Sequence, residues 1–196
     1  MKKRIAITGG IGSGKSTVCD IIRAQNFPVF SCDSIYKELL NDTEYIEAVR
    51  TAFPQVVITQ RIDTCKLAKI VFSDETQRKK LNDLAHSRIM TKLFACMNDC
   101  DTDFVFAEVP LLFEGNYASK FDKVIVVTRE RKKRVQAVLL RDGCTQEEAI
   151  MRIQAQFDYD GENAKKLFQQ DNVVIIENNE GMEALLLQVK NALVKL

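Results

Sequence analysis

The amino-acid sequence predicts an α/β fold in which a parallel sheet carries helices on both faces. Three observations predict it: short apolar runs alternate with segments of helical spacing, two of these runs are continuously apolar, and the first run ends in a glycine-rich turn that opens a helix. A continuously apolar strand is typical of a sheet that is buried on both faces. The 196 residues, 46% of them hydrophobic, suffice for one domain with a sizeable core.

Each predicted strand is an apolar run that stops at glycine, at an acidic residue or at a polar turn. The predicted strands are residues 3–8, 28–31, 104–107, 123–128 and 173–176. The predicted helices are residues 15–25, 131–141, 145–157 and 181–194, with an almost entirely helical stretch from 34 to about 98. Gly143 stands at a helix C-terminal cap, and Thr145 with Glu148 forms a capping box for the next helix. The alternation of strands and helices implies parallel connections.

Composition and charge narrow the classes of partner. A formal net charge of +1 argues against a nucleic-acid or membrane-surface footprint, and no apolar run approaches the roughly 20 residues of a membrane span. We therefore expect no nucleic-acid partner and no membrane partner. The six cysteines are scattered and no secretory h-region precedes them, so we expect free, mostly buried thiols in a reducing cytoplasm. The oligomeric state stays open, and a monomer is compatible with the sequence.

The segment Gly9–Ser16 (GGIGSGKS) fits the phosphate-binding pattern G-x-x-x-x-G-K-[ST] between a predicted strand and a predicted helix. Glycines let backbone N–H groups turn inward around a phosphate, and the N-terminus of the helix adds a partial positive charge. The Lys15 ammonium reaches the outer phosphates, and the Ser16 hydroxyl is a ligand for Mg²⁺. The predicted binding residues for a nucleoside triphosphate are Gly10, Ile11, Gly12, Ser13, Gly14, Lys15, Ser16 and Thr17.

A phosphate loop alone does not separate a kinase from a GTPase switch or a motor ATPase. The guanine-reading pattern N-K-x-D of a GTPase is absent from the sequence. Residues 158–161 (DYDG) imitate the D-x-x-G of a switch but lie beyond a predicted helix, so we interpret them as a helix-ending turn. The alternatives that stay open are small-molecule kinases, including nucleotide and shikimate-type kinases, and a nucleotide-dependent binding switch.

Two acidic residues end predicted strands, where open α/β sheets place their ligands. Asp33 can accept a proton from an attacking hydroxyl or orient it; the alternative is an N-cap of the following helix. Glu108 can hold a metal-bound water or a nearby backbone group; the alternative is a purely structural strand end. Leu111 and Leu112, in the apolar run 109–114, suit a wall of the substrate site, although core packing is the commoner role of such residues.

Basic residues of the predicted helix 131–141 suit the phosphates of a nucleotide. Arg134 and Arg141 are seven residues apart, which places them on one face and about 10.5 Å apart along the helix axis. Two guanidinium groups there can close over the phosphates as a lid, with Arg141 the stronger candidate. The alternative is a solvated basic face. His86 is the only histidine, and a lone histidine is typical of a structural residue.

With these residues in place, the chain resembles the dephospho-coenzyme A kinase family over nearly its whole length. The resemblance rests on TGGIGSGKST near the N-terminus, Asp33, VPLLFE at 109–114, Arg134, Arg141, Arg152, Gln156 and Asn178. The phosphate loop is generic, whereas VPLLFE after an apolar strand and the arginine series are far more specific. The resemblance implies an ATP-dependent phosphorylation of the ribose 3′-hydroxyl of dephospho-CoA, which gives CoA and ADP and is the last step of coenzyme A synthesis.

The resemblance also implies three parts and the roles of several residues. The parts are a core (1–33, 102–130 and 157–196), a helical CoA-binding part (34–101) and a lid (131–156). Asp33 is then the catalytic base, and Lys15 and Arg141 act on the transferred phosphoryl group. Arg134 and Arg141 bind ATP from the lid. The residues implied to bind dephospho-CoA are Asp33, His86, Glu108, Leu111 and Leu112.

The chain departs from the family pattern at three places. Ser31-Cys32-Asp33 stands where the family commonly has D-A-D, and Tyr36-Lys37 replaces the alanine-arginine that usually follows. Lys37 keeps the positive charge but lacks the bidentate guanidinium. His86-Ser87 replaces a typical histidine-proline pair. These departures bear on substrate affinity more than on the type of reaction.

Overall fold

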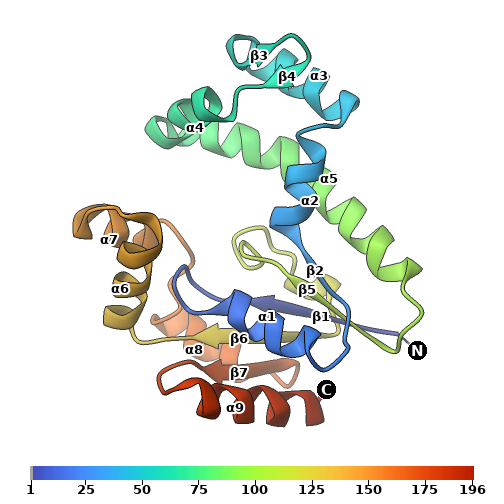
Figure 1. Ribbon diagram of the computed structural model, residues 1–196, viewed down its shortest axis with the longest axis vertical. Helices are drawn as coiled ribbons and strands as arrows, with labels where there is room; N and C mark the ends of the chain where they lie inside the picture. Colours follow the sequence, from blue (N-terminus) through green and yellow to red (C-terminus); the bar gives the residue numbers. More distant parts are fainter. Residues whose placement is uncertain (1) are drawn as a thin grey trace. The chain divides into compact units, whose positions relative to one another are not determined.

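The structure, a computed structural model, describes residues 2–196 and confirms the α/β class. The chain forms two compact units: residues up to Phe30 together with Cys100–Leu196, and Ser31–Asp99. The first unit is built on a five-stranded sheet in the order β2-β5-β1-β6-β7 (Figure 1). Its strands are β1 Lys3–Thr8, β2 Val29–Ser31, β5 Phe104–Glu108, β6 Lys123–Thr128 and β7 Val173–Glu177. All five strands predicted from the apolar runs are therefore present.

Helices pack against strands of this sheet, as the sequence predicts: α1 Lys15–Arg23, α8 Glu162–Phe168 and α9 Met182–Val194. The unit also contains α6 Arg131–Asp142 and α7 Gln146–Gln154, which contact each other, and a 3₁₀ turn at Ala118–Lys120. Ile5 and Ile7 of β1 pack with residues of α1 and α9 in the apolar core. Thr8 contacts Tyr159, in the segment before α8. Because successive side chains of a strand point to opposite faces, the segment around Tyr159 covers the face that α1 and α9 leave open.

β1 is the central strand and pairs in parallel with both β5 and β6. Ile7 stands opposite Glu108 on one side and opposite Ile125 on the other. The carboxyl ends of β1, β5 and β6 therefore meet at one edge of the sheet. The residues that follow β1 enter the glycine-rich turn at this edge, so strand pairing alone brings the turn close to the acidic end of β5.

The helix ends of the first unit follow sequence signals where those signals exist. Gly143 caps α6 with φ of 62°, in the left-handed region, and Thr145 with Glu148 forms the predicted capping box of α7. α7 ends at Gln154, before the predicted end at 157, because Gln156 bonds outside the helix. The sequence does not predict α8, a short helix in which Ala164 is the buried residue.

The second unit holds four helices: α2 Cys32–Leu39, α3 Thr43–Ala52, α4 Thr64–Ser73 and α5 Glu75–Asp99, with a 3₁₀ turn at Pro54–Val56. The stretch is almost entirely helical, as predicted, except for an antiparallel hairpin that the sequence did not predict, β3 Val57–Ile58 and β4 Arg61–Ile62. The turn residues Thr59 and Gln60 have φ of 46° and 62°. Two-residue hairpin turns of this kind usually carry Asn and Gly. This turn lacks the residue types that signal a hairpin.

The cysteines are free thiols, as predicted, but only Cys19 and Cys32 are buried. Burial, with a smaller effect of Glu108, raises the pKa of the Cys19 thiol to about 12. Cys19 is therefore an uncharged, unreactive residue on the buried face of α1.

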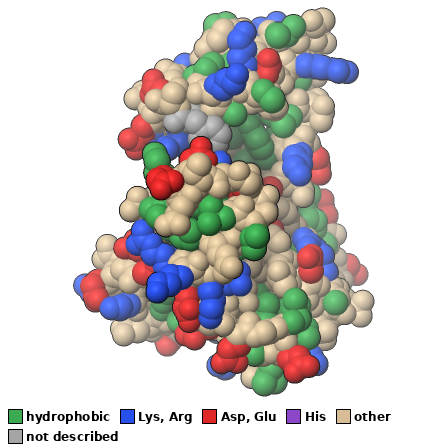
Figure 2. Space-filling view, turned by 60° about the vertical axis from the view of Figure 1, so that its left-hand side comes forward, with side chains coloured by type: hydrophobic (Ala, Val, Ile, Leu, Met, Phe, Trp, Pro, Cys, Tyr) green, Lys and Arg blue, Asp and Glu red, His purple; other side chains and the backbone are tan. Residues whose placement is uncertain are grey.

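The outer surface carries charges of both signs. Lys and Arg side chains are interspersed with Asp and Glu on the face that brings α6 and α7 forward (Figure 2). Across residues 2–196, none of the helices combines the length and the apolarity that crossing a bilayer requires.

Candidate active site

The glycine-rich turn between β1 and α1 is the phosphate loop, Gly9–Ser16. Gly9, Gly12 and Gly14 have φ of 147°, 77° and 94°, a region that side chains rarely adopt. A Cβ on Gly9 would lie 2.2 Å from the carbonyl oxygen of Val127 in β6. Gly14 is the N-cap of α1, and the first N–H groups of a helix have no partner within it. Backbone and helix N-terminus together form a cradle for an anion.

Lys15, Ser16 and Glu108 come together in this cradle. The Lys15 ammonium donates to the carbonyl oxygens of Gly9 at 2.8 Å and of Gly10 at 3.2 Å. The Ser16 hydroxyl donates to Glu108 Oε1 at 3.3 Å, and Glu108 is only 9% exposed. A glycine backbone, a cation and a hydroxyl beside a carboxylate fit the phosphates of a nucleotide with its divalent ion.

Arg134 lies against the phosphate loop and is buried. Its side chain is 3% exposed, its Nε donates to the carbonyl oxygen of Ile11 at 3.1 Å, and its Nη1 lies 3.7 Å from Asp160 Oδ2. A Cβ on Gly10 would lie 2.2 Å from its Nη2. Burial lowers the pKa of the guanidinium, and the charge of Asp160 opposes that shift. The alternative of a solvated basic face therefore does not apply to Arg134, which holds the backbone of the loop.

Two residues that the sequence offers only through the family resemblance also bond to the loop. The N–H of Ile11 donates to Gln156 Oε1 at 2.6 Å, and Asn178 Nδ2 donates to the carbonyl oxygen of Ser13 at 2.9 Å. Gln156 follows α7 and Asn178 follows β7. A lone glutamine or asparagine carries no pattern of its own, so local sequence signals do not find them. With Arg134, Gln156 bonds both backbone groups of Ile11.

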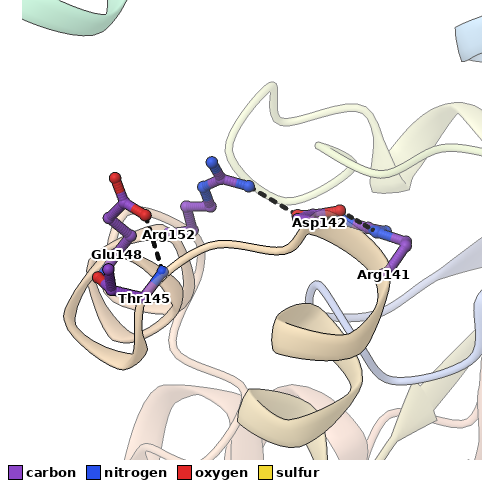
Figure 3. Close-up of polar contacts among 5 residues, drawn as sticks. All are labelled: Arg141, Asp142, Thr145, Glu148 and Arg152. Carbon is purple, nitrogen blue, oxygen red and sulfur yellow. Dashed lines mark hydrogen bonds and ion pairs between the residues drawn. The ribbon is translucent and has the colours of Figure 1, made fainter.

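Arg141 stands at the C-terminal end of α6 and shares one carboxylate with Arg152 of α7 (Figure 3). Its Nε and Nη2 donate to Asp142 at 2.7 and 3.1 Å, and Arg152 Nη1 donates to the same carboxylate at 2.6 Å. The Arg141 side chain is 62% exposed and that of Asp142 is 19% exposed. The capping box of Thr145 and Glu148 closes the turn beside them. The Arg141 side chain is thus largely exposed, and its bonds with Asp142 fix the direction of its guanidinium.

The shared carboxylate leads to a prediction about stability. The hydrogen bond from Arg141, with the charges of Arg141 and Arg152, holds the pKa of Asp142 below its ordinary value. Asp142→Asn is expected to lower the free energy of unfolding at neutral pH by about 0.5 kcal/mol, because both arginines are well exposed. The contribution requires the ionised carboxylate, so it is present above the ordinary carboxyl pKa and is lost as the pH falls through the lowered pKa of the folded state.

Urea unfolding of the wild type and of Asp142→Asn, from neutral pH down to about pH 3, measures this difference. The two proteins are expected to converge in stability at the acidic end. A difference that stays constant over the whole range contradicts the role of the ionised carboxylate.

The remaining predicted residues occupy different environments. Leu111 is half-buried, and Leu112 is fully buried, which favours the core-packing alternative for Leu112. Asp33 is exposed in the first turn of α2, whose N-cap is Ser31, so the N-cap alternative for Asp33 was wrong. His86 is half-buried in α5. Asp33 and His86 belong to the second unit, and their part in the site stays a prediction.

Comparison with known proteins decides the family. Residues 3–183 match the family model described as Dephospho-CoA kinase. The chain belongs to the dephospho-CoA kinase family. The Dephospho-CoA kinase of Oceanobacillus iheyensis is 35% identical over 97% of this chain and 96% of its own length, and that of Geobacillus kaustophilus is 36% identical over 92% and 90%. The resemblance read from the sequence is confirmed, and as a member of the dephospho-CoA kinase family the chain is an ATP-dependent kinase.

Solved structures agree with this assignment. The crystal structure of TT1252 from Thermus thermophilus superposes with a TM-score of 0.83 at 30% identity and covers 98% of this chain and 96% of that one. A shikimate kinase from Bacteroides thetaiotaomicron, with a TM-score of 0.53 at 14% identity over 99% of both chains, shares the fold alone. The α/β fold with a phosphate loop is therefore confirmed for this member of the dephospho-CoA kinase family.

Proposed function

We propose that the chain transfers the γ-phosphoryl group of ATP to the 3′-hydroxyl of the ribose of dephospho-CoA and releases CoA and ADP. The observation that carries the proposal is the family match over residues 3–183. The geometry of the phosphate loop supports it, since the loop keeps the glycine backbone, the cation and the hydroxyl that a triphosphate requires. In the cell this reaction is the last step of coenzyme A synthesis.

The nucleotide is held by the loop and by residues of α6. Lys15 exchanges its contacts with the carbonyl oxygens of Gly9 and Gly10 for phosphate oxygens, because charge-assisted hydrogen bonds to phosphate are stronger. Arg134 supports ATP through the backbone of the loop, to which its Nε is bonded. The exposure of the Arg141 side chain supports its role at the transferred phosphoryl group.

Mg²⁺ belongs to the proposed site. Within residues 2–196 no group of three or more His, Cys, Asp and Glu side chains is arranged to hold a metal ion. The Ser16 hydroxyl would therefore hold the ion together with phosphate oxygens, and Glu108, 3.3 Å from Ser16, would accept from a metal-bound water. The ion, when bound, neutralises charge on the outer phosphates.

The acceptor side of the reaction depends on Asp33, whose exposed carboxylate can take the proton of the attacking hydroxyl. In this proposal, dephospho-CoA is bound by Asp33, Glu108, His86 and Leu111. Leu112 is fully buried, so it would support the site by packing behind the residues that contact the substrate. The helical unit Ser31–Asp99 is then the CoA-binding part, and residues 131–156 are the lid. Free cysteines support a cytoplasmic location, and a monomer suffices for the mechanism.

A coupled assay of ADP release tests the proposal. With ATP and Mg²⁺ present, ADP release is expected to depend on dephospho-CoA, and mass spectrometry of the product is expected to find CoA. Nucleoside monophosphates and shikimate serve as alternative acceptors in matched reactions. ADP release that follows one of these acceptors and not dephospho-CoA contradicts the proposal.

A further inference from the structure

The segment between α7 and α8 contacts the end of β1, where the chain enters the phosphate loop. It contains residues 158–161, which the sequence suggests are a helix-ending turn. Tyr159 in this segment is 6% exposed, and its hydroxyl lies 3.2 Å from Oγ1 of Thr8, the last residue of β1. The Tyr159 hydroxyl therefore contacts the residue that leads directly into the phosphate loop.

Gly9 links the contact between Tyr159 and Thr8 to Lys15. It follows Thr8 directly in the chain, and its carbonyl oxygen accepts from Lys15 Nζ at 2.8 Å. On the side of β6, a Cβ on Gly9 would lie 2.2 Å from the carbonyl oxygen of Val127. Gly9 is thus held between Thr8, which Tyr159 contacts, the Lys15 ammonium and the neighbouring strand. The phenol bonds the residue directly before the one to which the Lys15 ammonium donates.

The ring of Tyr159 is held by contacts that do not involve its hydroxyl. Its centroid lies 6.0 Å from that of Phe113 and 5.1 Å from that of Phe157. The N–H of Phe157 in turn donates to Glu114 Oε1 at 2.8 Å. Because this packing fixes the ring, a phenylalanine at position 159 keeps the ring in place and removes only the hydroxyl.

The hydroxyl is a neutral phenol at ordinary pH. Burial raises the pKa of Tyr159 to about 12, although the hydrogen bond with Thr8 acts in the opposite direction. A neutral phenol can donate to the Thr8 hydroxyl or accept from it. Thr8 is 0% exposed, so water does not replace the phenol when it is removed.

We infer that Tyr159 is a positioning residue for phosphoryl transfer, whose hydroxyl fixes the Thr8–Gly9 corner of the phosphate loop and, through Gly9, the place from which Lys15 meets the triphosphate. Tyr159 acts through Gly9 and Lys15 and does not touch the reacting atoms. The kinetic part of this inference rests on the proposed function, whereas its ATP-binding part does not need an acceptor.

Tyr159→Phe is expected to raise the Kd for ATP about five-fold and to lower kcat/KM for ATP about ten-fold, because the buried Thr8 hydroxyl next to Gly9 loses its partner. The KM for dephospho-CoA is expected to change by less than about two-fold. Thr8→Val removes the other hydroxyl of the same contact and is expected to change the Kd and kcat/KM for ATP by similar factors. Thr8→Ser keeps this hydroxyl, so its values for ATP are expected to stay near those of the wild type. Titration calorimetry with ATP and the coupled ADP assay measure these quantities.

Phe27→Leu is the matched control for lost packing, since the Phe27 ring packs on Phe106 with centroids 5.4 Å apart. It is expected to lower the midpoint of thermal unfolding and to leave the Kd for ATP unchanged. If Tyr159→Phe behaves like this control, or if it raises the KM values for ATP and dephospho-CoA equally, the inference is overturned. If the wild type binds ATP but does not phosphorylate dephospho-CoA, the proposed function fails, and the Kd of Tyr159→Phe for ATP still decides the role of Tyr159.

Discussion

Lys15→Ala is expected to lower kcat/KM for ATP by about 10²–10³-fold while the protein stays folded. The Lys15 ammonium bonds the carbonyl oxygens of Gly9 and Gly10, inside the loop that faces the phosphates. Negative charge on the transferred group has to be stabilised at this place, and alanine removes the cation that does so. The loop loses the two bonds from Lys15 to Gly9 and Gly10 but keeps its glycine conformations and its bonds to Arg134, Gln156 and Asn178, which do not involve this side chain.

Steady-state kinetics of ADP release measure the effect of Lys15→Ala, and circular dichroism checks the fold. Lys166→Ala is the matched control, because Lys166 is an exposed cation of α8 that contributes equally to the net charge. The control is expected to stay within about two-fold of the wild type, since exposed charges far from a site act weakly. A Lys15→Ala enzyme of wild-type efficiency is incompatible with the proposed phosphate loop.

Asp33→Asn is expected to keep the affinity for ATP and to lower kcat by about 10²–10⁴-fold. An amide has the shape of a carboxyl group but cannot accept the proton of the attacking hydroxyl. Asp33 is exposed in the first turn of α2, and its side chain does not cap that helix, so the substitution is not expected to affect folding. Titration calorimetry gives the Kd for ATP, and single-turnover experiments with dephospho-CoA give the rate of transfer.

The control for Asp33→Asn is Asp99→Asn, which makes the same chemical change at an exposed residue at the end of α5 in the same unit. Wild-type turnover is expected for this control. Unchanged turnover in Asp33→Asn itself removes Asp33 from the mechanism. A large loss of ATP affinity instead assigns the carboxylate to nucleotide binding.

Local patterns were enough to predict the strands of the five-stranded sheet, the phosphate loop and the caps on either side of Cys144. The loop residues Gly9–Ser16 are contiguous, and their glycine conformations follow from a turn that only glycine adopts easily. Gly143 and the pair of Thr145 and Glu148 act within one helical turn, so the residue types themselves carry the signal. Local patterns did not predict the hairpin of the second unit, because Thr59 and Gln60 stand at turn positions that usually carry Asn and Gly.

Contacts between distant segments lie beyond such patterns. The spacing of Arg134 and Arg141 places both on one face of α6, but the burial of Arg134 depends on the loop, more than a hundred residues earlier, packing against that helix. Tyr159 lies in a polar turn, and only its packing against Phe113 and its bond to Thr8 give it a role. In the same way, local patterns miss Gln156 and Asn178, because their partners in the phosphate loop come close to them only when the chain folds.

The position of β1 has a consequence for how the site tolerates motion. β1 has a neighbour on either side, and Ile7 is aligned with both Glu108 and Ile125. Main-chain pairing in the middle of the sheet therefore sets the distance between the start of the phosphate loop and Glu108. We expect local opening of the outer strands, β2 and β7, to leave this distance unchanged. Phosphoryl transfer should then not depend on motion at the two edges of the sheet.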